Sequence, residues 1–349
     1  MKPLRIGIIG AGQIAESAHI PAYQSLPKYA TVAAICDTVQ ERANQVARRF
    51  SIPHVYTDYR EMLKAISPDL VSVCVPNQLH YGLVMEALEA GSHVFCEKPP
   101  AITLAEAEAM QEKAAKEGLL LSYNFCHRHR GEMKALLQKV REHALGDIYG
   151  VEVIAQRRRA IPGWGSFTNK DIQGGGPLID LGIHMLDAAL CLLGYPKPAY
   201  VCAGMHDKIG KQGGMGLFGA WKGGDSYTVE DSAFGFVQFE NGTTMTVKTS
   251  FALHTAQRET TVMNLHLYGN QAGASLSPCM IYSGEAGSFL NETIPFAPVD
   301  HIVAGAKNMV LGIWGLEELV VTGENVLLTQ KIMNAMYESA EQGRPVCFR

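Results

Sequence analysis

Residues 4 to 123 alternate between short apolar runs and segments with the apolar spacing of helices. The apolar runs occupy residues 4–9, 31–36, 54–56, 70–75, 93–96 and 119–123. Strands that are apolar along their whole length and alternate with helices are typical of a parallel sheet covered by helices on both faces. The alternation therefore predicts an α/β, doubly wound N-terminal domain, in which ligands bind beyond the carboxyl ends of the strands.

A glycine-rich turn follows the first of these strands. The segment Gly10-Ala11-Gly12-Gln13-Ile14-Ala15 leads into residues of helical character. Gly10 allows a tight turn, and Gly12 lets a pyrophosphate approach the backbone. The motif alone is weak evidence, because glycines also mark ordinary strand-to-helix turns. In the context of strand, turn and helix N-terminus, however, it predicts an anion site of the Rossmann, dinucleotide-binding type.

Asp37 directly follows the second apolar run. An acid there accepts hydrogen bonds from the ribose hydroxyls of an adenosine. It lies beyond the ~20 residues that the fingerprint expects, which a longer first crossover explains. A carboxylate repels a 2′-phosphate and no arginine follows immediately, so the sequence favours NAD over NADP. The alternative role of Asp37 is a cap for the helix that starts near Val39.

Polar residues also follow the later strands of this domain. A lysine held between a strand end and two prolines is poorly placed for a freely solvated surface charge. This lysine is Lys98, which follows Glu97 and precedes Pro99 and Pro100. The expected cofactor-binding residues are Gly10, Gly12, Gln13, Ile14, Asp37, Pro76, Asn77, His80, Glu97, Lys98 and Asn124.

The pattern changes after about residue 131. A long strand is expected at 148–158, and strand-like runs follow at 200–205, 232–239, 243–251 and 262–268. Glu240-Asn241-Gly242 is a strong hairpin signal. A chain of 349 residues also exceeds what one core usually serves. We therefore expect residues 1–125 to form the dinucleotide-binding domain and residues 126–349 to form an α+β substrate-binding and oligomerisation domain with a large, mostly antiparallel sheet.

The segment 174–193 reads GGGPLIDLGIHMLDAALCLL and predicts a loop feeding a helix of about five turns. Asp180, His184 and Asp187 are spaced to stack on one face of this helix. One alternative is an ordinary amphipathic helix with a neutral, hydrogen-bonded histidine. The role of Asp187 stays open: it either supports His184 or is solvated.

Three motifs occur in a specific order: GIIGAGQIA at the N-terminus, Glu97-Lys98-Pro99, and GGGPLIDLGIHMLD. Together they resemble the Gfo/Idh/MocA family of sugar and cyclitol oxidoreductases, and the resemblance covers nearly the whole chain. The segment 163–170 that leads into the glycines looks like the branch that oxidises the 3-hydroxyl of D-glucosides. Neighbouring branches act on myo- or scyllo-inositol and on other hexose derivatives.

The resemblance implies an NAD(P)-dependent dehydrogenase acting on CH–OH groups of a sugar or cyclitol. It implies that Lys98 hydrogen-bonds the reacting hydroxyl, that Asp180 orients substrate and lysine, and that His184 takes the hydroxyl proton. Histidine suits this role because its unperturbed pKa is near ~6.5, and the chemistry needs no metal. Inositol 2-dehydrogenation, or a retained NAD that assists hydrolysis or epimerisation of glycosides, remains an alternative.

The expected substrate-binding residues are Arg128, Arg157, Trp164, Asp180 and His184. Trp164 either packs on the nicotinamide or a sugar face, or anchors its own loop. The close spacing of His127 and His129 in the sequence is a pattern that metal sites also show. The two histidines lack cysteine or carboxylate partners at ligand spacing, so no metal is expected.

The net charge of −4 offers no basic field for nucleic acid or an anionic membrane. No uninterrupted apolar run approaches the ~20 residues of a membrane span. Eight cysteines without a CxxC pair, and an N-terminus without the apolar region of a signal peptide, predict a reducing cytoplasm. The resemblance further implies a homo-oligomer, dimer or tetramer, formed through one face of the C-terminal sheet.

Overall fold

The computed structural model describes residues 2–285 and 287–348. The chain forms two compact units, one of Met1–His129 with Asp300–Leu327 and the other of Arg130–Val299 with Leu328–Arg349. The expected division into 1–125 and 126–349 is corrected in one respect, because residues 300–327 belong to the first unit. The reason is packing: Ala306, Met309 and Val310 of this late segment are buried in the same core cluster as Ile6 and Ile8.

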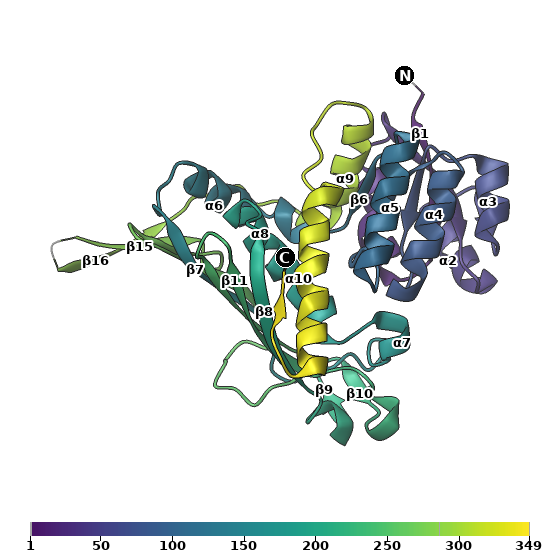
Figure 1. Ribbon diagram of the computed structural model, residues 1–349. Coiled ribbons are helices and arrows are strands. Elements are labelled where there is room, and N and C mark those ends of the chain that lie inside the picture. Colours follow the sequence, from purple (N-terminus) through teal and green to yellow (C-terminus); the bar gives the residue numbers. More distant parts are fainter. Residues whose placement is uncertain (1, 286, 349) are drawn as a thin grey trace. The chain divides into compact units, whose positions relative to one another are not determined.

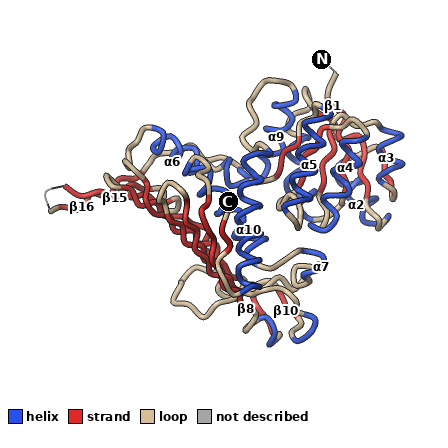
Figure 2. Tube along the Cα trace, viewed as in Figure 1, coloured by secondary structure: helices blue, strands red, loops and turns tan. Residues whose placement is uncertain are grey.

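The first unit contains a six-stranded sheet in the order β3-β2-β1-β4-β5-β6, and every pairing is parallel (Figure 2). The strands are β1 (Leu4–Ile9), β2 (Ala30–Cys36), β3 (His54–Tyr56), β4 (Leu70–Val73), β5 (His93–Cys96) and β6 (Leu121–Tyr123). The helices are η1 (Ala15–His19), α1 (Ile20–Gln24), α2 (Gln40–Phe50), α3 (Tyr59–Ile66), η2 (Asn77–Leu79), α4 (His80–Glu89), α5 (Leu104–Glu117), η3 (Cys126–His129) and α9 (His301–Ile313). The predicted doubly wound parallel sheet is confirmed.

Local signals set the helix ends. Helix α5 begins with a capping box, in which Thr103 and Glu106 satisfy each other's backbone N–H groups. It ends at Gly118, which adopts a left-handed conformation with φ +65°. Helix α3 has a simple N-cap, Asp58, whose side chain accepts from the Arg60 N–H.

The strand register brings the functional edge together. Ile9, at the end of β1, lies opposite Cys36 and Val73, and Val73 lies opposite Cys96. Cys96 in turn lies opposite Tyr123. The residues that follow these strand ends therefore share one edge of the sheet, as the sequence predicts for the ligand-binding side of the first unit.

The second unit is built on a nine-stranded sheet in the order β16-β15-β14-β13-β7-β12-β11-β8-β17. The strands are β7 (Ile148–Arg157), β8 (Pro198–His206), β11 (Ser232–Phe239), β12 (Thr244–Ser250), β13 (Thr261–Gly269), β14 (Gly273–Ser275), β15 (Met280–Glu285), β16 (Ser288–Thr293) and β17 (Val346–Cys347). Only the β7–β12 pairing is parallel among these strands. The expected mostly antiparallel sheet is confirmed.

Helices cover one face of this sheet (Figure 1). They are α6 (Gly131–Arg141), α7 (Lys170–Gln173), η4 (Leu178–Gly182), α8 (Ile183–Leu193) and, from Leu328 onward, α10 (Gly323–Gln342). Helix α8 packs on β7 and β13. By length and composition alone the segment Lys170–Leu193 could cross a membrane, but 83% of that window is buried inside the structure, as in a core helix.

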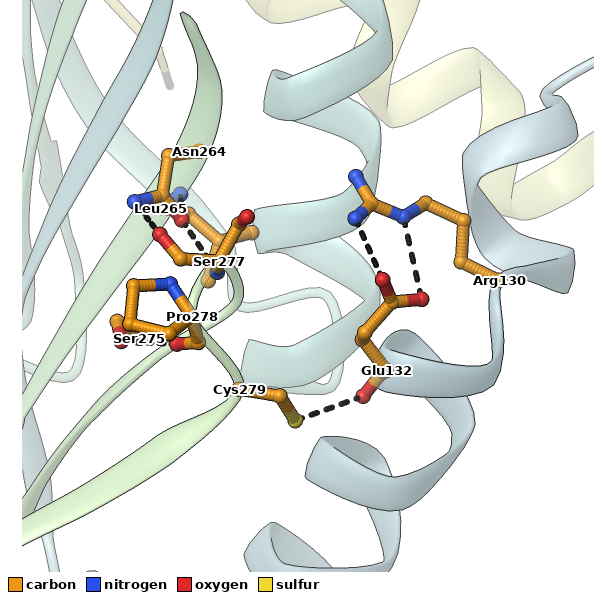
Figure 3. A network of polar contacts seen from close by, with 8 residues as sticks. All are labelled: Arg130, Glu132, Asn264, Leu265, Ser275, Ser277, Pro278 and Cys279. Atoms are coloured by element: carbon orange, nitrogen blue, oxygen red, sulfur yellow. Dashed lines mark hydrogen bonds and ion pairs between the residues drawn. The ribbon is translucent and has the colours of Figure 1, made fainter. Parts of the chain in front are cut away.

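A polar network joins α6 to the β13–β15 strands (Figure 3). The Asn264 side chain donates to the Ser277 carbonyl at 2.6 Å and accepts from the Ser277 N–H at 2.8 Å. The Cys279 thiol donates to the Glu132 carbonyl at 3.7 Å, and the Glu132 carboxylate pairs with Arg130 at 2.9 Å. These contacts hold the loop before β15 against the start of α6.

Candidate functional site

The glycine turn of the first unit is shaped by two different requirements. Gly10 has φ +98°, and a Cβ on it would lie 2.2 Å from the Cys74 carbonyl oxygen. A Cβ on Gly12 would meet nothing within 4 Å. Gly10 is therefore needed by the fold, whereas the space over Gly12 is open to a ligand. This matches the separate roles predicted for the two glycines.

Asp37 anchors this turn. Its Oδ2 accepts from the Ala11 N–H at 2.9 Å, and its Oδ1 accepts from the Val39 N–H at 2.8 Å. The helix-cap contact weighed as an alternative is thus present. The guanidinium of Arg42, on α2, lies 3.5 Å from Asp37 Oδ2. No arginine follows Asp37 immediately in the sequence, but the helical fold of α2 brings one beside it.

A cavity of about 670 Å³ opens beside the turn, entirely within the first unit. Its lining includes Gly10, Gly12, Asp37, Pro76 and Leu79, and it is mostly apolar. A cavity of this size, with open space over a glycine and a carboxylate at its wall, fits the adenosine and pyrophosphate portion of a dinucleotide. Of the expected cofactor residues, Gly10, Gly12, Asp37 and Pro76 line it. The others are not among the described lining residues: Gln13, Ile14, Asn77, His80, Glu97, Lys98 and Asn124.

Glu97 lies at the centre of a buried polar network. Its Oε1 lies 2.8 Å from His19 Nε2 and accepts from the Asn124 side chain at 2.7 Å. His19 Nδ1 lies 2.6 Å from Ser72 Oγ, which is 2.9 Å from the Tyr23 hydroxyl. Burial raises the pKa of Glu97, but the His19 contact outweighs it and holds that pKa below its ordinary value. Glu97 is thus ionised and engaged inside the protein.

Lys98 follows Glu97 and is half-buried. The segment after it is fixed by His80, whose Nδ1 lies 2.8 Å from the Pro99 carbonyl and whose Nε2 lies 3.0 Å from the Val75 carbonyl. Burial lowers the pKa of His80, and the contacts with the two carbonyls oppose that effect. The ring is completely buried, so its expected contact with the cofactor is corrected: it braces the strand ends.

One further sequence expectation changes for the same reason. Arg128 is 3% exposed and donates to the Val320 carbonyl at 3.2 Å, so it is not available to a sugar. Glu97 and Asn124 are 8% and 4% exposed and bind each other. These residues support the edge of the sheet from within, and polar residue type after a strand does not distinguish that role from contact with a ligand.

In the second unit, a buried carboxylate holds the loop before α8. Glu230 accepts from the N–H groups of Gly176 at 2.9 Å and Leu178 at 3.1 Å, and from the Tyr337 hydroxyl at 2.9 Å. A Cβ on Gly175 would lie 2.0 Å from the Tyr337 oxygen, and one on Gly176 would lie 2.1 Å from the Glu230 carbonyl. The glycines are therefore required by close packing against Glu230 and Tyr337, two residues that the sequence did not single out.

The helix that follows differs from the uniform five-turn helix predicted. Its first turn, η4, is a wider π-type turn, and the α-helical part begins at Ile183. Asp180 and His184 are half-buried, whereas Asp187 is 1% exposed and its Oδ1 accepts from the Thr329 hydroxyl at 3.1 Å. Asp187 is therefore not solvated, and it ties α8 to α10.

Arg157 is close enough to Asp180 for the carboxylate to influence its pKa. Burial lowers the pKa of Arg157, and Asp180 opposes that effect. The guanidinium lies 4.8 Å from the ring centroid of Phe218 and 5.7 Å from that of Phe251. Its Nε is buried and has no hydrogen-bond partner among the described residues. An unsatisfied buried donor beside a carboxylate is a candidate contact for a polar ligand.

Trp164 is 48% exposed and stands edge-on to Phe218, with ring centroids 5.3 Å apart. Phe218 lies in the tight turn between β9 (Gly214–Gly216) and β10 (Gly219–Trp221). The segment 207–225 reads as a loop in the sequence, but it contains this antiparallel hairpin. Trp164 thus has the loop contact weighed as one alternative and also keeps an exposed aromatic face.

One group in the first unit has metal-ligand chemistry. Ligand atoms of Cys126, His127 and His301 all lie within 4.8 Å of one another. Cys126 is the direct sequence neighbour of His127, and the third member, His301, comes from a distant segment, because α9 packs on η3. The reasoning that His127 lacks a cysteine partner is therefore wrong in space. The two imidazole rings are also in contact, with centroids 5.5 Å apart and ring planes inclined by 53°, which accounts for their proximity without an ion.

Each unit contributes functional groups that are suited to one kind of chemistry. The first unit has a cavity that fits part of a dinucleotide and a braced Glu97-Lys98 segment. The second unit places Asp180 near the guanidinium of Arg157, and His184 follows Asp180 by four residues. A hydride acceptor site, an ammonium, an imidazole and a carboxylate are the groups that alcohol oxidation requires.

Comparisons with known proteins agree with this geometry. The chain is 42% identical over 347 residues to the D-glucoside 3-dehydrogenase of Escherichia coli (strain K12), covering 99% of this chain and 97% of that protein. Levoglucosan dehydrogenase in complex with NADH and L-sorbose has the same fold, with a TM-score of 0.85, 21% identity and 100% coverage of both chains. The aldose-aldose oxidoreductase from Caulobacter crescentus has a TM-score of 0.80 at 23% identity, covering 99% of this chain and 100% of that one.

Two family matches cover most of the chain. Residues 4–125 match the oxidoreductase family with an NAD-binding Rossmann fold, and residues 133–275 match the GFO/IDH/MocA C-terminal domain. The resemblance first drawn from three short motifs thus extends over both units. The chain belongs to the Gfo/Idh/MocA family of oxidoreductases.

Proposed function

We propose that this protein is an NAD-dependent dehydrogenase that oxidises a secondary ring hydroxyl of a sugar, with the 3-hydroxyl of a D-glucoside as its site of reaction. The observation that carries the proposal is 42% identity to a D-glucoside 3-dehydrogenase along 99% of the chain. The cavity beside Gly12 and Asp37 supports NAD as the cofactor. The carboxylate of Asp37 disfavours the 2′-phosphate of NADP, although Arg42 beside it moderates that effect.

In the proposed reaction, bound NAD supplies the hydride acceptor. Lys98 donates a hydrogen bond to the reacting hydroxyl and offsets negative charge that develops on its oxygen. His184 accepts the hydroxyl proton while the carbon–hydrogen electron pair leaves as hydride, and the carbon–oxygen bond becomes a carbonyl. Asp180 orients substrate and ammonium, which fixes the reacting atoms in a productive geometry.

Two further side chains serve substrate binding in this proposal. Arg157 directs a buried, unsatisfied N–H toward sugar hydroxyls. Trp164 offers its exposed aromatic face to the apolar side of a pyranose ring. Asp180 lies near Arg157, so the three form one patch within the second unit for a neutral, hydroxyl-rich ring.

The test is an assay of the purified protein with NAD, or NADP in parallel, and methyl D-glucoside, followed by NADH absorbance. Substrates deuterated at single ring carbons locate the reaction, because only the oxidised carbon gives a primary isotope effect. An isotope effect at another carbon overturns the 3-position. Lack of turnover with glucosides, inositols and their keto forms overturns the dehydrogenase proposal. Product release without net NADH identifies instead a retained cofactor that assists hydrolysis or epimerisation.

Variants test the assigned groups. His184→Ala and Lys98→Met are expected to abolish turnover while the circular dichroism spectrum and melting temperature stay close to those of the wild type. Because the reaction needs no metal, treatment with a chelator leaves the rate unchanged. The metal-free reaction is contradicted if the chelator abolishes activity, zinc restores it, and Cys126→Ser causes the same loss. That result assigns a metal to the group of Cys126, His127 and His301.

We also propose a cytoplasmic homo-oligomer. On the sheet face away from α8, strand alternation places Tyr200, Phe234, Phe236 and Tyr268, and Phe234 and Tyr268 are 37% and 43% exposed. An aromatic face of this kind is stabilised by cover from a second subunit. Sedimentation velocity is expected to give a dimer or tetramer that Phe234→Glu dissociates, and a wild-type monomer at micromolar concentration contradicts it. Cell fractionation tests the location, which the eight cysteines without a CxxC pair support.

A further inference from the structure

His19 is a completely buried titratable group outside the proposed reaction. It ends η1, is 0% exposed, and packs against Phe95 with ring centroids 5.2 Å apart. Both ring nitrogens are engaged, Nε2 by Glu97 Oε1 at 2.8 Å and Nδ1 by Ser72 Oγ at 2.6 Å. A buried imidazole held between a carboxylate and a hydroxyl is well placed to keep a proton on each nitrogen.

The charges around His19 agree with that protonation state. Burial lowers its pKa, but the contacts of His19 with Cys74 and Glu97, hydrogen bonds included, outweigh burial and raise the pKa to about 10. Tyr23 and Cys74 are the other titratable groups beside His19, and burial raises the pKa of Tyr23, which stays neutral. Glu97 is ionised at neutral pH. His19 and Glu97 therefore form a buried ion pair with no net charge.

Glu97 links this pair to the next residue. Its Oε1 is occupied by His19 and Asn124, and its Oε2 lies 3.3 Å from the backbone N–H of Lys98. A carboxylate without a counter-ion in this place is unfavourable, and it attracts the nearest available cation. Lys98 is close enough to influence the pKa of Glu97, so it is the cation that a lone Glu97 would draw in.

We propose that His19 is a positioning residue for Lys98: its imidazolium is the counter-ion of Glu97, which leaves the ammonium of Lys98 directed to substrate. The inference rests on the proposed function, because it takes the role of Lys98 in polarising a hydroxyl as given. It extends that function to a residue that is 79 positions earlier in the chain (98 − 19) and has no contact with substrate.

Kinetics of His19→Gln test this role. The expected result is a fall in kcat of about tenfold or more with KM for NAD changed less than about twofold. The high-pH limb of the kcat profile moves upward, because an unpaired Glu97 holds the neighbouring ammonium in its charged form to higher pH. The double variant His19→Gln/Glu97→Gln removes the stranded charge and recovers most of the lost kcat.

The matched control is Tyr23→Phe, which removes a buried hydroxyl from the same network without touching Glu97. It is expected to leave kcat and the pH profile close to the wild type. The proposal is overturned if Tyr23→Phe and His19→Gln lose the same fraction of kcat, the pH profiles of kcat stay unchanged, and the double variant recovers none of the lost kcat. The network would then have a structural role only.

An activity-independent measurement separates this inference from the proposed function. With ¹⁵N-labelled histidine, one imidazole is expected to keep imidazolium shifts at about pH 8, to disappear in His19→Gln and to become neutral in Glu97→Gln. Failure of the wild type to oxidise any sugar overturns the proposed function and, with it, the role toward Lys98, even where the spectra show the ion pair. A neutral His19 at that pH overturns the ion pair itself, whether or not the enzyme turns over.

Discussion

Replacing Thr329 by valine tests whether Asp187 is structural. The two side chains have nearly the same shape, so the change removes one hydroxyl donor and little else. The hydroxyl donates to Asp187 Oδ1 at 3.1 Å, and Thr329 and Asp187 are 0% and 1% exposed. The carboxylate loses a charge-assisted hydrogen bond in a place where water does not replace it.

The expected size of the effect comes from that one contact. A hydrogen bond to a charged group contributes about 1.5–3 kcal/mol, and the buried valine methyl returns little of it. In a unit of this size one kcal/mol shifts the melting temperature by roughly 2–4 °C, so Thr329→Val is expected to lower it by roughly 3–12 °C. The catalytic rate is expected to change by less than about twofold, because Thr329 touches neither Asp180 nor His184 in the proposed reaction.

Thr249 supplies a matched control in the same unit. It is 0% exposed, and its hydroxyl has no hydrogen-bond partner in the described part of the chain. Thr249→Val is therefore expected to leave the free energy of unfolding unchanged or to increase it by up to about 2 kcal/mol. The same substitution at two fully buried threonines should thus have opposite consequences.

Urea denaturation followed by tryptophan fluorescence measures both variants. Trp314 is the one tryptophan of the three in the first unit, so a Trp314→Phe background leaves Trp164 and Trp221 to report on the second. The reasoning is refuted if Thr329→Val keeps wild-type stability but loses activity, since Asp187 would then act on His184. It is also refuted if the two threonine variants lose the same stability.

Gly10→Ala is expected to prevent folding, because its Cβ would lie 2.2 Å from a backbone oxygen. Gly12→Ala should fold and bind NAD more weakly, as measured by calorimetry, and two folded variants with equal affinity for NAD contradict this. Asp37→Ser should lower kcat/KM for NAD by about tenfold and raise the ratio of NADP to NAD use, and an unchanged ratio counts against the ribose contact. Arg157→Leu should raise KM for the glucoside about tenfold without changing KM for NAD; equal rises in both KM values would place Arg157 elsewhere. The pKa of His19 is raised to about 10 in the folded protein, against ~6.5 in the unfolded chain. The stabilisation that follows from this difference is complete below pH ~6.5 and is lost as the pH rises through about 10. The stability gap between wild type and His19→Gln, measured in urea, should shrink over that range, and a constant gap means that His19 binds no extra proton.

The backbone plan of both units could be predicted from local patterns. Strand and helix periodicity identified the six parallel strands, and the hairpin signal at Asn241-Gly242 identified the turn between β11 and β12. Gly10 and Gly12 were assigned different tasks, and the geometry of the turn agrees. These features depend on residues that are close together in the sequence, so local sequence patterns are enough to predict them.

Burial of polar side chains could not be predicted in the same way. His80, Arg128 and Asp187 follow strands or lie on a helix stripe, as ligand-binding residues do, yet each is buried and bound to the protein. Their partners include Pro99, Val320 and Thr329, which are 19, 192 and 142 residues away. Partner choice over such distances is a property of tertiary packing, so His19 and Glu230 likewise left no local signal.

The segment 300–327 has a consequence for how the protein is made. Gly305 of α9 packs so closely on the first unit that a Cβ there would lie 3.1 Å from Phe95, and Ala306, Met309 and Val310 complete that unit's core. A ribosome has therefore passed His129 long before it synthesises the helix that closes this core. At synthesis rates of about 5–20 residues per second, the interval is roughly 10–40 seconds. During that time the nascent nucleotide-binding unit exposes apolar surface, which makes it a natural client for a chaperone, and expression of residues 1–129 alone is expected to leave the same surface uncovered permanently.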